Sequence, residues 1–516
     1  MNKASRTQNS LRNLVTGIGS NLVLTLVRFI CRTVLIKTLG SAYLGINGLF
    51  SNILSMLSLT ELGIDVAMNY KLYKPVAEND LPRIRALMKF YKYAYIVVGS
   101  VMLVLGLSLL PFLPNLIKDY DGIVSLGLNP FLLFLLFLSE TVCSYLFFAS
   151  KNAILKANQQ EYLISIVVLI SQFILNVLQI ISLLIFKDFT IYTLLSVLTA
   201  LATSTTVAII AKKKYPEAFE KSDDKLEKAE IKDLFKDLGG AFIYKVNGVV
   251  VKGTDNLILS TFIGLAIVGI YSNYILLYST IKTILERFFS AFRASLGNLY
   301  ATESLEKRYT FFEICNFLAF ILYGTAAVGI TVVTNELLVC WIGNDYVIAW
   351  PFSLLMGIEM LFLGINTSLS QIRNVTGIFR QLWFRPCIGI FINLAVSLAL
   401  VKPLGIYGVV IGTICASVFS NFLIDPAIIH KYSLENFKPV SLYYAKQFMY
   451  MAILAAVGFG DFILCKLILP DMGWLSVIVH IIICGVSVPL VFCLVFWKTH
   501  ECKRVVELVK TFLRIK

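Results

Sequence analysis

Basic side chains lie inside long apolar stretches of this sequence, where a charge is costly. Seven Lys and Arg residues fall within such stretches: Arg28, Arg32, Lys245, Lys252, Lys282, Arg287 and Arg293. A charge at the centre of a hydrocarbon layer costs roughly 2.5–3.5 kcal/mol, so intramembrane charges are usually functional. Arg287 and Arg293 are close enough to the end of their stretch to reach polar surroundings. Arg28, Lys252 and Lys282 are not.

These cations predict an anion-binding cradle. Arg28 and Arg32 are four residues apart and share one helix face. Guanidinium groups suit the paired oxygens of a phosphate, and Lys adds a point charge. The candidate substrate-binding residues are Arg28, Arg32, Lys245, Lys252 and Lys282. The alternative is that internal salt bridges join helices, with Glu61, Asp65, Asp255 or Glu286 as partners.

Two carboxyl groups also lie deep in apolar stretches. Glu140 and Glu359 are 219 positions apart and are each near the middle of a stretch. A carboxyl group in such surroundings could carry a proton, which makes both candidates for ion coupling. The alternative is that each bonds a neighbouring helix. Glu61 and Asp65 share a face near the end of another stretch and are further candidates, although pairing with loop cations is the simpler role for them.

The elements that must position these residues are transmembrane helices. Hydrophobic residues make up 58% of the 516 positions and charged residues only 15%, whereas soluble domains carry about 25% charged residues. Continuous apolar runs of about twenty residues cross a hydrocarbon core as helices. The sequence therefore predicts an all-α polytopic membrane protein with fourteen spans. These spans are 14–37, 43–68, 90–114, 126–149, 162–186, 190–211, 241–263, 267–292, 311–334, 350–372, 380–401, 405–429, 444–468 and 474–497.

The distribution of charge between the spans predicts that both termini are cytoplasmic. With that orientation the outside segments carry only Lys37, Lys118, Lys187, Lys402 and Lys466. The remaining Lys and Arg outside the spans fall on the inside, as cytoplasmic loops of membrane proteins require. We count Arg373, Arg380 and Arg385 among these loop cations. The net charge of +14 thus needs no nucleic acid as a partner.

The two halves of the chain resemble each other. Gly40, Ala42, Gly45 and Ile46 recur as Gly264, Ala266, Gly269 and Ile270 at an offset of 224, which also relates Arg28 to Lys252. Six spans per half keep both halves in one orientation. We expect an N-terminal lobe over 1–211, a cytoplasmic linker over 212–240, a C-terminal lobe over 241–430, and an added hairpin with a basic tail over 431–516.

Several classes of site have no support. The ten cysteines are scattered without a CxxC pair, and His430, His480 and His500 are far apart, so we expect no metal site and no cofactor. No nucleotide-binding GxxxxGK[ST] motif is present, and the loops leave little room for a catalytic domain. We therefore expect a protein that is not an enzyme.

Four sequence features carry a family resemblance. They are the Gly40-x-Ala42-x-x-Gly45 turn, the basic 69–92 loop, Lys156-Ala157-Asn158 and Leu404-Gly405-Ile406-Tyr407-Gly408. In these features residues 10–430 resemble the polysaccharide transporters, the Wzx-type flippases of the multidrug/oligosaccharidyl-lipid/polysaccharide exporter superfamily. The resemblance implies that an undecaprenyl-pyrophosphate oligosaccharide crosses the cytoplasmic membrane by alternating access for capsule, exopolysaccharide or O-antigen synthesis. It also implies membrane lipids, a polymerase and glycosyltransferases as partners.

Three alternatives stay open. Fourteen spans resemble the lipid II flippase branch of the superfamily, in which the extra hairpin is thought to help with the lipid tail. A multidrug cation antiporter would want an acidic cleft, whereas these spans look basic. A non-transporting subunit of a polysaccharide assembly complex would have no need of deep charges.

Overall fold

The computed structural model describes most of the chain, and every regular element in the described part is a helix. The described residues are 23–57, 71–76, 78–117, 120–147, 149–158, 160–220, 226, 253–291, 296, 299–300, 303–378, 381–468 and 473–513. The first described helix covers residues 23–39, and another begins at residue 253.

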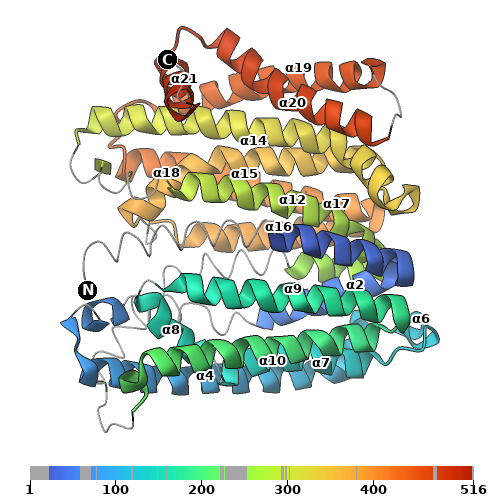
Figure 1. Ribbon diagram of the computed structural model, residues 1–516. Helices are drawn as coiled ribbons and strands as arrows, with labels where there is room; N and C mark the ends of the chain where they lie inside the picture. The colour runs from blue at the N-terminus through green and yellow to red at the C-terminus, as the bar shows by residue number, and fades with distance from the viewer. Residues whose placement is uncertain are drawn as a thin grey trace. The chain divides into compact units, whose positions relative to one another are not determined.

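Two compact units, residues Met1–Gly269 and Ile270–Lys516, divide the chain (Figure 1). The helices of unit 1 are α2 (Ser41–Leu57), α4 (Leu81–Leu109), η2 (Leu110–Phe112), α5 (Leu113–Leu116), α6 (Tyr120–Ser125), α7 (Pro130–Phe147), α8 (Ala149–Ala157), α9 (Glu161–Ile185), α10 (Phe189–Lys214) and η3 (Pro216–Phe219). Helix α12 (Leu265–Ala291) begins in unit 1 and continues into unit 2.

Unit 2 contains the remaining labelled helices. They are α14 (Leu305–Ile342), η4 (Asn344–Tyr346), α15 (Pro351–Thr376), α16 (Phe384–Leu404), α17 (Ile406–Ala416), η5 (Ser417–Phe422), α18 (Asp425–Tyr432), α19 (Val440–Ile468), α20 (Trp474–Val495) and α21 (His500–Leu513). The predicted lobe limits stay a prediction, because most of the 212–240 linker lies outside the described residues.

Nine helices in the described part are long and apolar enough to cross a membrane. They are Leu81–Leu116, Glu161–Ile185, Phe189–Lys214, Leu305–Ile342, Pro351–Thr376, Phe384–Leu404, Ile406–Tyr432, Val440–Ile468 and Trp474–Val495. The helices Pro130–Leu146 and Lys151–Ala157, which meet at a bend of 57°, make a tenth candidate if they are counted as one span. Each coincides with a predicted span, so the all-helical membrane architecture is confirmed. The count of fourteen stays a prediction.

Two glycines that the internal repeat relates have the same backbone geometry. Gly40 has a φ of 96° and Gly264 a φ of 133°, a region that side-chain-bearing residues rarely adopt. Gly40 separates the helix over 23–39 from α2, and Gly264 precedes α12 in the same way. The sequence repeat thus corresponds to a repeated helix–glycine–helix turn.

Small residues allow the helices within each unit to approach closely. In unit 1, a Cβ atom on Gly106 of α4 would lie 2.5 Å from Leu138 of α7. In unit 2, a Cβ atom on Gly364 of α15 would lie 2.2 Å from the Cβ atom of Tyr323 on α14. Close approach through small residues is how membrane helices gain packing energy without a hydrophobic effect between them.

Helices α19 and α20 form a hairpin that packs on α14 (Figure 1). Its core combines Phe317 and Phe320 of α14 with Tyr450 of α19 and Phe492 of α20. The Phe320 and Phe492 rings are stacked with centroids 5.6 Å apart. These ring contacts attach the α19–α20 hairpin to α14, and its status as an addition to a six-helix lobe stays a prediction.

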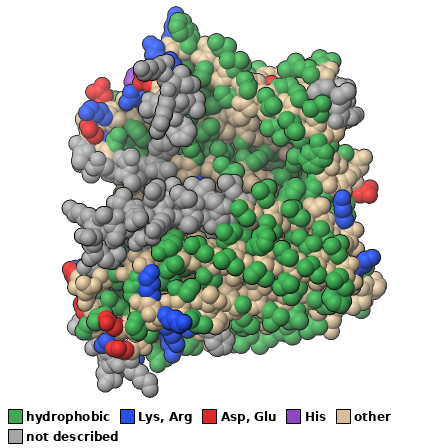
Figure 2. All heavy atoms as spheres, in the orientation of Figure 1, with side chains coloured by type: hydrophobic (Ala, Val, Ile, Leu, Met, Phe, Trp, Pro, Cys, Tyr) green, Lys and Arg blue, Asp and Glu red, His purple; other side chains and the backbone are tan. Residues whose placement is uncertain are grey.

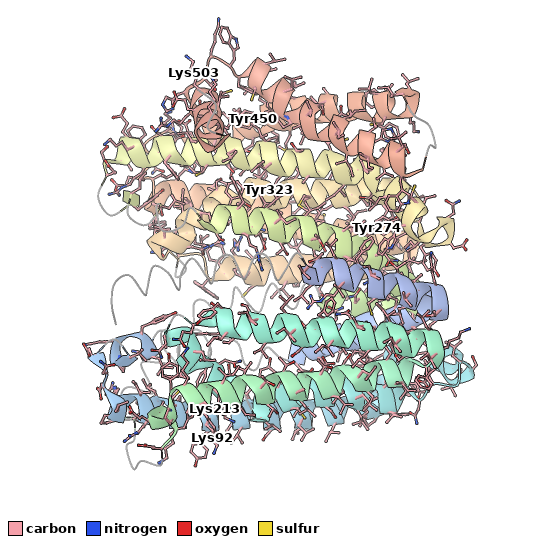
Figure 3. All side chains as sticks on the ribbon, viewed as in Figure 1. Lys92, Lys213, Tyr274, Tyr323, Tyr450 and Lys503 are labelled. Atoms are coloured by element: carbon pink, nitrogen blue, oxygen red, sulfur yellow. The ribbon has the colours of Figure 1, made fainter. Side chains whose placement is uncertain are left out.

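Charged side chains gather toward the helix ends, and hydrophobic ones cover the helices between them (Figure 2). In unit 1, Lys92 of α4, Lys151 of α8 and Lys212 of α10 are close enough for their charges to interact. Figure 3 shows the neighbouring Lys213 near Lys92. The charge distribution in the sequence predicts that all of these lysines are cytoplasmic. The structure places them together at one end of unit 1.

This clustering leads to a test of topology. A reporter fused after Lys214 is expected to lie in the cytoplasm, and one fused after Asn344 outside it, because positive loops remain inside. Alkaline phosphatase and green fluorescent protein fusions measure the two locations. Phosphatase activity after Lys214 would contradict the orientation.

An ion-pair network fixes α21 to unit 2. Lys446 of α19 donates to Glu313 of α14 at 2.5 Å and to Glu501 of α21 at 2.8 Å. Cys502 and Val505 of α21 are buried in the same core as Phe317. Burial alone would raise the pKa of Glu501, but its contact with Lys446 outweighs burial and leaves that pKa below the ordinary value of 4.5.

This network predicts a pH dependence for the docking of α21. The ionised Glu501 stabilises the docked helix above pH 4.5, and this stabilisation is lost as pH falls through the lower pKa of the docked state. Hydrogen exchange of residues 500–513, corrected for intrinsic rates, should therefore rise at the acid end. Glu501→Gln should exchange faster at neutral pH and show little further change on acidification. An identical pH profile in wild type and Glu501→Gln would refute the role of this contact.

Candidate functional site

Asp425, the most deeply buried charged side chain in the described part of unit 2, forms a triad with two arginines. Arg373 and Arg385 each donate from Nη1 to Oδ2 of Asp425, at 2.8 and 2.9 Å. The Asp425 side chain is 0% exposed, and the arginine side chains are 8% and 7% exposed. One carboxylate shared by two guanidinium groups leaves a surplus positive charge. Such a group is costly to bury unless another charge or polar surface lies nearby.

Local helix geometry sets the position of the triad. Arg373 lies in the last turn of α15, which ends at Gly377 in the left-handed conformation. Arg385 lies in the first turn of α16 and also donates to Asn421 at 2.5 Å. Asn421 belongs to the π-helical turn η5, which separates α17 from α18. Single π-helical turns often occur at functional sites because they re-aim side chains within a span.

A polar cavity of about 450 Å³ lies beside the triad and shares Arg373 with it. Its lining comes from α12 and α15, and Leu363 is the one apolar contributor. The polar lining is Thr283, Glu286, Arg287, Ser290, Asn366, Thr367, Ser370, Gln371, Arg373 and Asn374. Amides and hydroxyls of this kind bond sugar-like groups, and arginines bond phosphate oxygens.

A second, apolar groove of about 390 Å³ is lined by α14, α15 and α19. Hydrophobic and small residues line it, and Thr331 is the one polar side chain among them. Gly357 of α15 and Gly458 of α19 let both helices approach α14, because a Cβ atom would lie 2.2 Å from Thr331 and 3.3 Å from Val328. The Trp350 and Phe462 rings lie 4.9 Å apart at one end of the groove. This surface suits a hydrocarbon chain.

Helix α15 contributes to both surfaces. Leu354, Gly357, Ile358 and Leu361 line the apolar groove, and residues 363–374 line the polar cavity. At about 3.6 residues per turn the two sets of residues centre on opposite faces of α15, the groove on the side of α14 and α19 and the cavity on the side of α12.

The predicted cationic residues are dispersed. Arg28 is exposed, and Arg32, four residues later, is partly buried near Tyr192 of α10. Lys282 of α12 pairs with Glu286 of the same helix at 3.7 Å, so this pair does not join two helices, and the role of Lys282 stays a prediction. Lys245 and Lys252 lie outside the described residues, and the predicted cradle stays a prediction.

The predicted carboxylates are also separate. Glu140 of α7 is partly buried and interacts with Tyr192, as Arg32 does. Glu359 of α15 is within hydrogen-bonding reach of the Tyr278 hydroxyl on α12. Glu61 and Asp65 lie outside the described residues. Ion coupling through any of these groups stays a prediction.

Sequence reasoning missed the triad. Arg373 and Arg385 were expected to be loop cations, but this was wrong about their surroundings, because each is buried within a helix against Asp425. The available signal was Asp425 itself, which lies inside the predicted span 405–429 and requires a cationic partner there.

Neither a family model nor a curated protein matches this sequence. Solved structures do match it. The lipid II flippase MurJ in an inward closed conformation has a TM-score of 0.66 at 13% identity, covering 94% of this chain and 99% of that one. An inward-facing multidrug resistance MATE family transporter of the MOP superfamily has a TM-score of 0.63 at 14% identity, covering 80% and 96%.

A point mutant of the Vibrio cholerae MATE transporter VcmN has a TM-score of 0.52 at 13% identity, covering 84% of this chain and 99% of that one. The chain has the fold of these transporters. With its apolar helices, it is an integral multi-pass membrane protein.

The triad gives a prediction about stability. Asp425→Asn leaves two buried guanidinium groups without their counter-ion, which should cost about 3–5 kcal/mol. Thermal unfolding of the purified protein in detergent should therefore shift to clearly lower temperature. Asp345→Asn, at an exposed position of η4, is the control and should unfold as wild type does. Equal unfolding temperatures for the two variants would mean that the triad does not stabilise unit 2.

Proposed function

We propose that this chain is a flippase that moves undecaprenyl-pyrophosphate-linked oligosaccharides across the cytoplasmic membrane. The observation that carries the proposal is that α15 lines both a polar cavity containing arginines and an apolar groove. A lipid-linked sugar has both kinds of surface. The fold shared with MurJ and with MATE transporters supports a transport role.

The polar cavity suits the headgroup. Arg287 and Arg373 would contact the pyrophosphate, since a guanidinium group bonds two phosphate oxygens at once. A charge pair at 4 Å is worth about 4 kcal/mol at an effective dielectric constant of 20, so two arginines offset much of the desolvation cost. Asn366, Gln371 and Asn374 would bond sugar hydroxyls. A volume of about 450 Å³ falls within the usual range for ligand sites.

The groove between α14, α15 and α19 suits the part of the polyprenyl chain nearest the headgroup. Burying apolar surface is worth roughly 25 cal/mol per Å² only against water, so in a membrane the groove contributes shape selection rather than a large affinity. The added hairpin supplies one wall through α19. This assigns the hairpin a role in tail guidance, as its resemblance to the lipid II flippase branch implies.

The charge of the cavity argues against the multidrug cation antiporter. Its lining has two arginines against Glu286, which already pairs with Lys282. An organic cation would be repelled there. A lipid II-type substrate shares the pyrophosphate and the polyprenyl chain, so the sugar is what distinguishes it. A scaffold subunit has no use for a polar cavity inside a membrane unit.

The remaining parts of the proposal rest on the sequence. Two lobes would alternate access to the substrate. Arg28, Arg32, Lys245 and Lys252 would form a second contact for the pyrophosphate, and Glu140, Glu359, Glu61 and Asp65 are the proposed coupling groups. A polymerase and glycosyltransferases would act before and after this step in polysaccharide assembly.

The test is transport in proteoliposomes. The probes are a fluorescent undecaprenyl-pyrophosphate oligosaccharide, scored by quencher access to the outer leaflet, and ethidium as an organic cation. Wild type should flip the lipid and not move ethidium. Arg287→Ala should slow flipping at least about tenfold, which corresponds to the loss of a charge-assisted hydrogen bond. Arg287→Lys should keep part of the rate, because Lys keeps the positive charge but cannot bond two phosphate oxygens at once as a guanidinium group does.

Two further variants sharpen this test. Arg504→Ala removes an exposed arginine of α21 that pairs with Glu507, outside the cavity, and should flip at the wild-type rate. Arg28→Ala should also slow flipping if the predicted cradle exists. Ethidium transport without lipid flipping would overturn the proposal in favour of the antiporter. Flipping at the wild-type rate by Arg287→Ala would show that the polar cavity does not bind the headgroup.

A further inference from the structure

A carboxylate, an imidazole and a hydroxyl meet where the added hairpin contacts α14. His480 Nδ1 of α20 lies 2.7 Å from Glu336 Oε2 of α14. Ser476 of α20 donates to the other carboxylate oxygen of Glu336. The His480 and Glu336 side chains are 6% and 21% exposed. His480 Nε2 is buried and has no hydrogen-bond partner among the described residues.

A line of polar side chains continues from this pair into the hairpin. Ser476, His480, Cys484 and Ser487 follow one face of α20 at helical spacing. Ser487 donates to Asp461 of α19 at 2.6 Å, and Cys484 is within hydrogen-bonding reach of Cys465. From Ser476 to Ser487 the helix rises about 16 Å, or half of a hydrocarbon core. The line therefore runs from one membrane surface to about the bilayer centre.

We propose that the Glu336–His480 pair is a proton-binding site of the hairpin. With neutral His480, which then donates from Nδ1, the pair carries one negative charge. Proton uptake at Nε2 makes the pair neutral overall and removes a net charge from surroundings where charge is costly. The buried Nε2 is the atom that receives the proton, and no other group needs to dissociate.

The groups around the pair favour a proton over a metal ion. Both Glu336 oxygens are already bonded, and the Glu336 charge also interacts with Cys340 on α14 and Cys465 on α19. Cys465 in turn interacts with Asp461 on α19 and Cys484 on α20. No set of three His, Cys, Asp or Glu side chains in the described part of the chain is arranged to hold a metal. Intramembrane carboxylates and histidines that form such lines commonly relay protons.

The position of the pair connects it to the apolar groove. Val332 of α14 lines the groove, and Glu336 follows it by one helical turn. The hairpin that carries His480 also carries the α19 wall of the groove. Proton binding would therefore change the contact between hairpin and α14 next to the groove. By the charge bias of the sequence, this end of α14 faces the outside.

Titration of His480 tests the site without any substrate, so its result is independent of the proposed transport function. The chain has three histidines, and ring-labelled histidine in lipid nanodiscs gives three signals that His480→Gln and His500→Gln assign. The His480 ring signal should change from that of the neutral to that of the protonated imidazole as pH is lowered, because Nε2 takes up the proton. Glu336→Gln should change the proton affinity of His480 by at least about tenfold.

Asp345→Asn, which alters an exposed carboxylate three residues beyond α14, is the matched control and should leave the titration within about twofold of wild type, less than half a pH unit. A His480 signal that does not titrate in wild type overturns the proposal, and this arm needs no variant at position 336. A change smaller than tenfold in a folded Glu336→Gln protein overturns the pairing as well.

Discussion

A charge buried in a membrane protein needs an opposite charge or a polar group beside it, and the described part of unit 2 has three places where helices meet around such a charge. Asp425 joins the ends of α15 and α16 to α18. Lys446 joins α14, α19 and α21. His480 joins α20 to α14. Each group adds a charged contact between helices whose apolar contacts are not strongly favoured in hydrocarbon surroundings.

The three places differ in the net charge that remains after pairing and in whether the paired groups can take up a proton. At Asp425 one carboxylate serves two guanidinium groups, so positive potential remains beside the polar cavity. At Lys446 two carboxylates surround one ammonium group, which suits a purely structural contact near the membrane surface. At His480 the partner of the carboxylate is itself titratable. The same need to pair charge thus yields the proposed anion site, the attachment of α21 and the proposed protonation site.

Composition and charge bias predicted the helical membrane architecture, the hairpin after residue 430 and the lysines that share one end of unit 1. Each of these depends on the length of an apolar run or on the charge of a loop, and both can be read from a short stretch of sequence. The site was harder to predict. Arg373 and Arg385 are close to span ends and read as loop cations, and only the packing of α18 shows that Asp425 draws both inside. For Lys282 the sequence left two roles open, a phosphate contact and a salt bridge, and the structure places its ammonium group 3.7 Å from Glu286 of the same helix.

Helix α15 is continuous from Pro351 to Thr376. Its rise from Ile358 in the groove to Arg373 in the cavity is about 22 Å, at roughly 1.5 Å per residue. A rigid helix cannot shorten this interval, so α15 fixes the distance between the groove and the cavity. Two molecules with the same headgroup and the same tail, but with a different spacing between them, would not occupy both surfaces equally well.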